Sequence, residues 1–380
     1  MNKRVSSIIL TVLLSLTVLF SFGCNGSTTP PEPEKNPLKY YEYSYEKFND
    51  LAEPLFKLPG CSQYIPPQSI TYWEERDWAF VAGYVFDSKG QPDPSLYIVD
   101  IKTGEKIGSY KIYDANNIIH SSYVGGLACT TKNLFISSKG NLYRLPLNQF
   151  STPIMDGCAQ ISEVIDVPAG AAHCSYADGK LWVGDFYLKG QQTNYQLPSD
   201  RPKPVGLNLQ GQKYYEAQPC AFGYDLEDTE SEISWNKTTE KMGATPDYCV
   251  IIQEKIRGFT LYNNFAIFVS CYGAGNAIVY YKKCDLVNQE PNATTLINGV
   301  EVPTWDRGLY YNKNSQKGLV DSVNAMPNAL SVAAYKGDLL LLFSSGTQIY
   351  SMPEAQWKEA YATEYAWQLK FPSTLVEPKE

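Results

Sequence analysis

A repeated pair of apolar strand patterns is the feature of this sequence that most restricts its fold. Each pair consists of a turn, a strongly apolar segment, a second turn and another segment rich in Val, Ile, Tyr or Leu, which is typical of neighbouring strands joined by hairpins. The five predicted pairs cover residues 78–85 and 95–100, 133–138 and 141–145, 178–186 and 220–226, 264–270 and 276–281, and 337–345 and 347–351. Self-similarity of this kind indicates a repeat architecture.

Shorter segments of small residues precede all five units, and polar–apolar segments follow most of them. The preceding segments are residues 69–71, 126–128, 174–176, 258–260 and 330–332, and the following ones are residues 106–112, 161–167 and 247–253. Four strands per unit predict four-stranded antiparallel blades of a β-propeller. One blade cannot bury both of its faces, whereas a closed ring of blades buries all of them. We therefore predict an all-β fold, a β-propeller with five blades.

Several alternatives to this fold stay open. The third unit carries a long insertion that can hide a sixth blade, and a β-sandwich or two separate β domains would also use many short strands. Residues 47–58 and 353–362 have the pattern of short amphipathic helices. The wider segments 40–60 and 354–370 can instead supply strands that close the ring.

Five stretches of the sequence resemble secreted bacterial β-propeller proteins of the NHL and YVTN-like kind. They are residues 123–128, 176–186, 256–260, 270–273 and 342–350. These stretches build blades, so the resemblance implies the fold. It does not imply an activity, because propellers serve as enzymes, lectins and scaffolds alike.

The N-terminus predicts export. Lys3 and Arg4 precede an apolar segment over residues 8–22, which is short for a membrane-spanning helix and fits a cleavable signal peptide of residues 1–23. Residues 21–24 resemble the lipobox of bacterial lipoproteins, which implies a lipid on Cys24. Ordinary cleavage, which would leave a fully secreted protein, and a retained signal anchor are the alternatives.

The segment after Cys24 predicts a tether. Residues 24–39 are rich in Pro, Thr and Glu and have little to bury, so they favour an extended linker. Residues 40–380 then form a single β-propeller domain. The expected location is the cell envelope outside the cytoplasm, with membrane attachment through the lipid.

Eight cysteines other than Cys24 form an even set, which suggests disulfides in an exported chain. The expected bridge joins Cys271 to Cys284, because both flank one predicted hairpin. Free buried thiols are the alternative. No C-x-x-C pair occurs, which argues against a zinc ribbon.

Charge and residue types restrict the chemistry. The net charge is −8 and no basic patch occurs, so we do not expect nucleic acid as a partner. The chain has only two histidines, which disfavours a metal site. It has no G-x-S-x-G motif, which disfavours a hydrolase with a Ser-His-Asp triad. No cofactor is predicted; calcium would need oxygen ligands from several blades.

Ligands of propellers often bind near the starts of the innermost strands. In this sequence those positions belong to Gln68, Gly125, His173, Arg257 and Asn328. Convergent polar groups in a pocket are the default binding-site hypothesis. The alternative is that they hydrogen-bond water and neighbouring strand ends.

Aromatic residues in the long insertions suggest a second kind of site, at the rim. The candidates are Tyr195, Tyr214, Tyr215, Trp305, Tyr310 and Tyr311. Exposed rings stack on sugars or anchor protein partners. The alternative is that they cover blade edges.

The leading interpretation is a surface-tethered, non-catalytic propeller that binds a protein or glycan partner through rim loops. A hydrolase or lactonase-like enzyme with His173 and Arg257 at the channel mouth is the second interpretation. A structural component of the cell envelope is the third.

Overall fold

The computed structural model describes residues 45–86, 90, 92–188, 195, 204–207, 213–215, 219–226, 245–271, 276–297, 299–307, 319–347 and 362–375. All of these residues belong to the compact unit Leu38–Glu380. The predicted signal peptide, Cys24 and the tether lie outside the described residues. Across the described ranges, no helix has the length and apolar character needed to cross a membrane.

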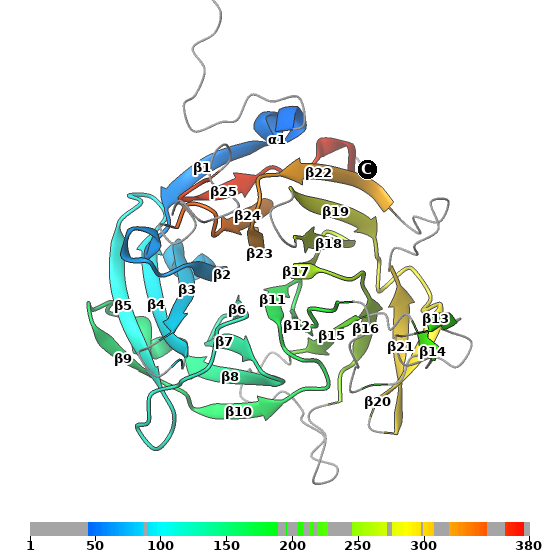
Figure 1. Cartoon of the computed structure of the whole chain (residues 1–380), viewed down its shortest axis with the longest axis horizontal. Coiled ribbons are helices and arrows are strands. Elements are labelled where there is room, and N and C mark those ends of the chain that lie inside the picture. Colours follow the sequence, from blue (N-terminus) through cyan, green and yellow to red (C-terminus); the bar gives the residue numbers. More distant parts are fainter. Residues whose placement is uncertain are drawn as a thin grey trace, which may run out of the picture. The chain divides into compact units, whose positions relative to one another are not determined.

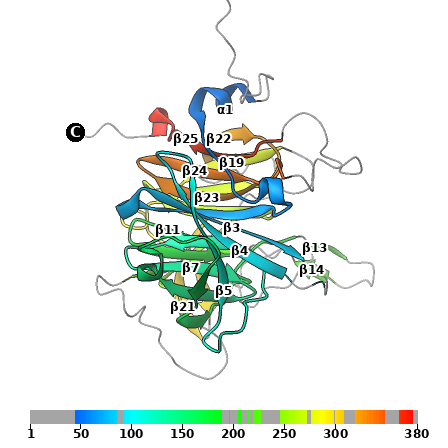
Figure 2. The ribbon, with the colours of Figure 1, turned by 90° about the vertical axis from the view of Figure 1, so that its left-hand side faces the viewer.

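Five sheets stand around a common axis in a closed ring (Figure 1). The prediction of an all-β, five-bladed propeller with mostly four-stranded antiparallel blades is confirmed. Within a blade, neighbouring strands lie side by side, as Figure 2 shows for β3, β4 and β5. The ring rules out the sandwich and the six-bladed alternative.

The strands are assigned to blades in chain order, from the axis outward. Blade 1 contains β2 (Pro67–Trp73), β3 (Trp78–Phe86), β4 (Pro92–Asp100) and β5 (Lys106–Tyr113), and β9 (Gly157–Gln160) pairs in parallel with β5. Blade 2 contains β6 (Gly126–Cys129), β7 (Asn133–Ser138), β8 (Asn141–Pro146) and β10 (Glu163–Asp166). Blade 3 contains β11 (His173–Ala177), β12 (Lys180–Gly184), β15 (Cys220–Asp225) and β16 (Tyr248–Ile251), extended by β21 (Val300–Asp306) and β20 (Ala293–Ile297). Blade 4 contains β17 (Ile256–Tyr262), β18 (Phe265–Ser270), β19 (Ala277–Lys283) and β22 (Leu319–Ala325). Blade 5 contains β23 (Ala329–Tyr335), β24 (Asp338–Phe343), β25 (Tyr365–Leu369) and β1 (Ala52–Lys57).

A few elements lie outside the blades. In the described part of the third unit's insertion, β13 (Pro204–Leu207) and β14 (Lys213–Tyr215) pair only with each other. The helices among the described residues are α1 (Glu46–Leu51) and the short 3-10 helices η2 (Cys61–Gln63), η3 (Glu74–Arg76), η4 (Leu147–Phe150) and η6 (Ser373–Leu375).

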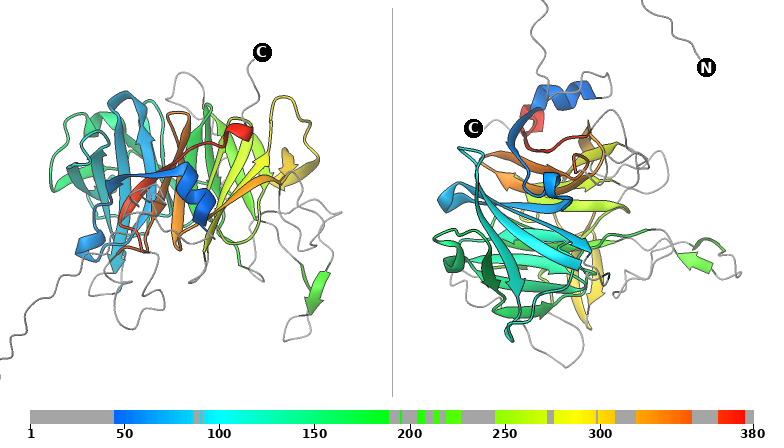
Figure 3. Two further views of the ribbon diagram at one scale, coloured as in Figure 1. Left: turned by 90° about the horizontal axis from the view of Figure 1, so that it is seen from above. Right: turned by 60° about the vertical axis from the view of Figure 1, so that its left-hand side comes forward.

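The ring closes between strands from opposite ends of the chain. β1 pairs antiparallel with β25, from Ala52 opposite Leu369 to Lys57 opposite Tyr365, and Figure 3 shows the two strands side by side. The predicted helix over residues 47–58 is therefore only half correct, since it ends at Leu51. In blade 5 the strand beside β24 is β25, and residues 348–351 of the predicted third strand lie outside the described residues.

Five hydrophobic clusters fill the spaces between neighbouring blades, one for each interface. β24 shows how one strand serves two of them. Leu339 and Leu341 face blade 4, whereas Leu340 and Leu342 face blade 1. A strand buried on both faces needs a continuous apolar run, because successive side chains point to opposite sides.

The innermost strands crowd near the axis, as the small residues in their sequences predict. A Cβ atom added to Gly126 in β6 would lie 2.1 Å from the backbone nitrogen of Cys174 in β11. A Cβ atom on Gly258 in β17 would lie 3.0 Å from the backbone nitrogen of Val332 in β23. Glycine permits this close approach of backbones from different blades.

Candidate functional site

The central channel has two openings, defined by the direction of the five innermost strands. These strands are β2, β6, β11, β17 and β23. We call the end at which they begin the start-side opening. The end at which they finish, in the turns that lead to the second strands, is the turn-side opening. A cavity lies at each of them.

The start-side cavity, of about 410 Å³, brings together three of the five predicted mouth residues. Gln68, Gly125 and Arg257 line it. Its other walls include residues that the sequence did not single out: Tyr84, Tyr123, Val124, Gly170, Ala172, Asp185, Phe186 and Leu330. The Arg257 guanidinium carbon lies 3.9 Å from the centre of the Phe186 ring, a cation–π contact.

Asp185 is the buried carboxylate of the start-side cavity. Its Oδ2 accepts a hydrogen bond from the Tyr195 hydroxyl at 2.5 Å, and its Oδ1 accepts one from the Gly170 backbone N–H. The Tyr195 oxygen in turn accepts the Cys220 backbone N–H at 2.8 Å. Burial raises the pKa of Asp185 to about 6, although both hydrogen bonds oppose the shift.

Replacement of Asp185 by Asn tests the cost of this buried charge. The folded pKa lies above the unfolded value, so the charge destabilises the fold increasingly as pH rises from about 4 to 6. We expect Asp185→Asn to raise the free energy of unfolding by about 1–3 kcal/mol at pH 7.5 and to give no gain near pH 3.5. Denaturant titrations at the two pH values measure the difference. An equal increase in the free energy of unfolding at both pH values would contradict an effect of the Asp185 charge.

Two predicted mouth residues do not line the start-side cavity. His173 is 2% exposed and packs between blades 3 and 4, with its ring 6.4 Å from that of Phe259 and against Gly184. Burial lowers the pKa of His173 to about 4. Asn328 has a φ of +61° and its backbone N–H contacts the Cys271 sulfur at 3.2 Å. A ligand-binding role of either residue stays a prediction.

The predicted rim aromatics are buried where the structure describes their side chains. Tyr195 is hydrogen-bonded to Asp185, and the Trp305 indole N–H donates to the Gln289 carbonyl at 2.9 Å. These two residues hold insertions in place and present no exposed ring to a partner. The side chains of Tyr214 and Tyr215, and all of Tyr310 and Tyr311, lie outside the described residues.

The predicted disulfide between Cys271 and Cys284 is absent, since both thiols are free and buried. Strand register explains why. Cys271 follows β18 at the end where Ser270 pairs with Ile278, and Cys284 follows β19 at the other end of the hairpin. A strand of this length separates them by roughly 20 Å, far beyond the reach of a disulfide.

The turn-side cavity, of about 560 Å³, was not predicted. Four tyrosines, each from a different blade, line it together with Trp73: Tyr72, Tyr176, Tyr262 and Tyr335. Polar groups between them include Thr130, Thr131, Glu74, Glu75, Asp178 and Lys336. The Tyr72 hydroxyl donates to Asp77 at 3.0 Å, and Asp77 pairs with Lys336 at 2.6 Å.

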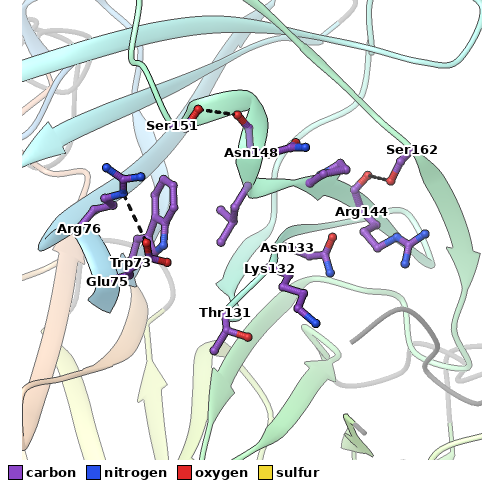
Figure 4. Close-up of a pocket in the computed structure, with 12 residues that line it drawn as sticks. Trp73, Glu75, Arg76, Thr131, Lys132, Asn133, Arg144, Asn148, Ser151 and Ser162 are labelled. Carbon is purple, nitrogen blue, oxygen red and sulfur yellow. Dashed lines mark hydrogen bonds and ion pairs between the residues drawn. The ribbon is translucent and has the colours of Figure 1, made fainter. Parts of the chain in front are cut away.

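A second cavity, of about 620 Å³, adjoins the turn-side cavity and lies over blades 1 and 2 (Figure 4). The two cavities share Trp73, Glu75 and Thr131. The rest of the second cavity is formed by Arg76, Lys132, Asn133, Arg144, Pro146, Leu147, Asn148, Ser151 and Ser162. We call the two cavities together the turn-side groove. Sequence reasoning missed it because its residues come from strand ends and turns of separate blades.

A metal site is not formed by the described part of the chain, in which no three His, Cys, Asp or Glu side chains gather.

Comparisons with known proteins leave the family open. No family model matches the sequence, and no curated protein matches it. Solved structures do resemble it. Glutaminyl cyclase from Myxococcus xanthus is 9% identical with a TM-score of 0.38, over 77% of this chain and 91% of that one. Sqt1 from Chaetomium thermophilum is 11% identical with a TM-score of 0.32, over 77% and 97%. The tail fiber of Staphylococcus aureus phage P68 is 11% identical with a TM-score of 0.38, over 77% and 50%. At these scores we draw no conclusion about activity from them.

Proposed function

We propose that this protein is an exported, lipid-tethered propeller that binds a glycan in the turn-side groove without cleaving it. The observation that carries the proposal is the pair of adjoining cavities that share Trp73, Glu75 and Thr131. Together they form an open, elongated site that suits a chain of sugar units. The lipobox-like sequence at Cys24 and the Pro-rich segment after it support attachment to a membrane surface.

The walls of the turn-side groove have the chemistry that sugar rings require. Tyr72, Tyr176 and Tyr262 are half-buried, so each ring is held in place while part of it faces the cavity. Aromatic rings pack against the apolar faces of sugars. Hydroxyl and amide groups such as those of Thr131 and Asn148 supply hydrogen bonds for sugar hydroxyls.

Tyr176 provides the test of glycan binding. We expect Tyr176→Ala to weaken binding of neutral oligosaccharides about tenfold, because one stacking surface is lost. Calorimetric titration with glucose, galactose and mannose oligosaccharides measures this. Tyr123→Ala is the matched control, since Tyr123 is also half-buried but lines the start-side cavity.

Two outcomes would reject the proposal. If no oligosaccharide binds the wild type, the groove has another role. If binding depends on Tyr123 and not on Tyr176, the glycan lies at the start-side opening. Chromatography of the sugar after incubation shows whether the chain is recovered intact, and shortened products would identify a hydrolase.

The start-side cavity supports a second candidate, an enzyme at the channel mouth. A carboxyl group whose pKa is raised to about 6 by burial, in a cavity with Arg257, is a combination found at catalytic sites. His173 does not line this cavity, so Asp185 replaces it as the candidate base. Loss of an activity in Asp185→Asn with retained folding would favour this candidate.

A further inference from the structure

The charges of the turn-side groove are divided between its two halves. The central half, at the channel, is lined by three carboxylates, those of Glu74, Glu75 and Asp178, and by one cation, Lys336. The outer half, over blades 1 and 2, is lined by three cations, Arg76, Lys132 and Arg144, and by one carboxylate, Glu75. A positive cleft on a protein with a net charge of −8 is a local feature that attracts anions.

We propose that the outer half of the groove is a subsite for an anionic sugar, carboxylated or sulfated, within the bound glycan. The inference rests on the proposed glycan binding and adds the class of sugar. Neutral units occupy the central half, because its carboxylates would repel an acidic unit.

Arg76 is fixed in a position to contact such a sugar. Its guanidinium carbon lies 5.7 Å from the ring centres of both Trp73 and Trp78. Its ion pair with Glu75 is long, at 3.7 Å, and both side chains are exposed, so it contributes little. A planar guanidinium held against aromatic rings presents a fork of N–H donors that matches a carboxylate or sulfate.

Lys132 and Arg144 complete the subsite from blade 2, across the cavity from Arg76 (Figure 4). The Lys132 carbonyl accepts the Leu147 backbone N–H at 2.8 Å, which fixes the turn that carries it. Arg144 is anchored by Glu163, with its Nη2 3.0 Å from the carboxylate. The anchored guanidinium still contributes to the positive potential of the cavity.

Trp73 connects the two halves of the groove. Its side chain is 4% exposed and lines both halves of the groove. Its indole nitrogen is buried and finds no hydrogen-bond acceptor among the described residues. A buried donor without a partner costs about 1–3 kcal/mol.

The test compares three forms of one glycan by calorimetric titration: a galactose oligosaccharide that ends in a single galacturonate, the same chain with this carboxylate reduced, and the reduced chain with a sulfate on its terminal unit. We expect the wild type to bind at least one charged form about tenfold more tightly than the reduced chain at low salt. The preference should disappear in about 1 M salt, where charges are screened within about 3 Å. The two charged forms distinguish a carboxylate from a sulfate.

Charge-removing variants assign the preference to residues. In the double variant Arg76→Gln and Lys132→Gln, the charged and reduced chains should bind equally, at the affinity that the wild type has for the reduced chain. Lys370→Gln is the matched control, because Lys370 is exposed at the end of β25 and does not line the groove. It should leave the preference unchanged.

The outcomes distinguish failure of the anionic subsite from failure of the proposed glycan binding. Equal binding of charged and reduced chains by the wild type overturns the anionic subsite while glycan binding stands. A preference that persists in the double variant, or is lost in Lys370→Gln, also overturns the subsite. Binding of none of the three chains removes both the subsite and the glycan proposal.

Discussion

A chain without residues 45–58 is expected to lose the cooperative unfolding transition of the ring. The deletion removes β1, whose pairing with β25 closes blade 5. It also removes Phe48, which is fully buried and lies 5.3 Å from Trp367 between ring centres, and Phe56, which is buried towards blade 1. Lost burial of these and the neighbouring apolar side chains amounts to about 5–8 kcal/mol, comparable with the whole stability of a typical domain.

A rearranged chain separates the loss of β1 from a general effect of truncation. Because Ala52 lies opposite Leu369, residues 45–58 attached after residue 375 through a flexible Gly/Ser linker can return to the same place. This permuted chain should regain a single cooperative transition in thermal unfolding followed by circular dichroism. If the truncated chain unfolds cooperatively at the wild-type temperature, ring closure through β1 is not what stabilises the fold.

The second large effect is expected for the substitution Gly126→Ala, which should lower the free energy of unfolding by about 3–5 kcal/mol. The new Cβ atom would lie 2.1 Å from the Cys174 nitrogen and 2.7 Å from the His173 carbonyl carbon, both backbone atoms of β11. No side-chain rotation relieves such a clash, so β6 and β11 must move apart at the axis.

Gly299→Ala is the control for this substitution. Gly299 has a φ of +81° and open space around its Cα, so it tests the backbone cost of alanine alone, about 1 kcal/mol. Denaturant titrations of both variants give the comparison. A cost for Gly126→Ala no greater than that for Gly299→Ala would mean that the innermost strands are not closely packed.

The blades were predictable because both faces of each blade are buried. Runs such as Leu339–Leu342 have no polar alternation, and the flanking turns carry residues that adopt positive φ, such as Asp178 and Gly179. Ring closure was not predictable in the same way. Residues 347–351 have a local strand pattern, but the partner of β24 is chosen by contacts that reach from β1 to β25.

The candidate sites were predictable as backbone positions and not as side-chain directions. Gln68 and Arg257 begin innermost strands and line the start-side cavity as expected. His173 also begins an innermost strand, yet its side chain points between two blades, because neighbouring positions in a strand face opposite ways. A shift of one residue in register, invisible in a single sequence, decides which side chain reaches the channel.

Asp185 and Tyr195 show that burial of side chains in and beside insertions could not be predicted from the sequence. Asp185 lies near the end of the predicted apolar segment 178–186 and was not singled out, and Tyr195 suggested an exposed loop aromatic. Their hydrogen bond buries both. The turn-side groove was missed for a related reason, since Trp73, Thr131 and Asn148 come from segments of separate blades that only the closed ring brings together.

A crystal structure of the protein with a bound galactose oligosaccharide that ends in a single galacturonate tests the central claim most directly. The account predicts sugar rings along the turn-side groove, with neutral faces against Tyr176 and Tyr262 and a carboxylate within hydrogen-bonding distance of Arg76 or Lys132. Sugar bound instead in the start-side cavity beside Arg257 and Gln68, or no sugar at concentrations that saturate binding in solution, would contradict it.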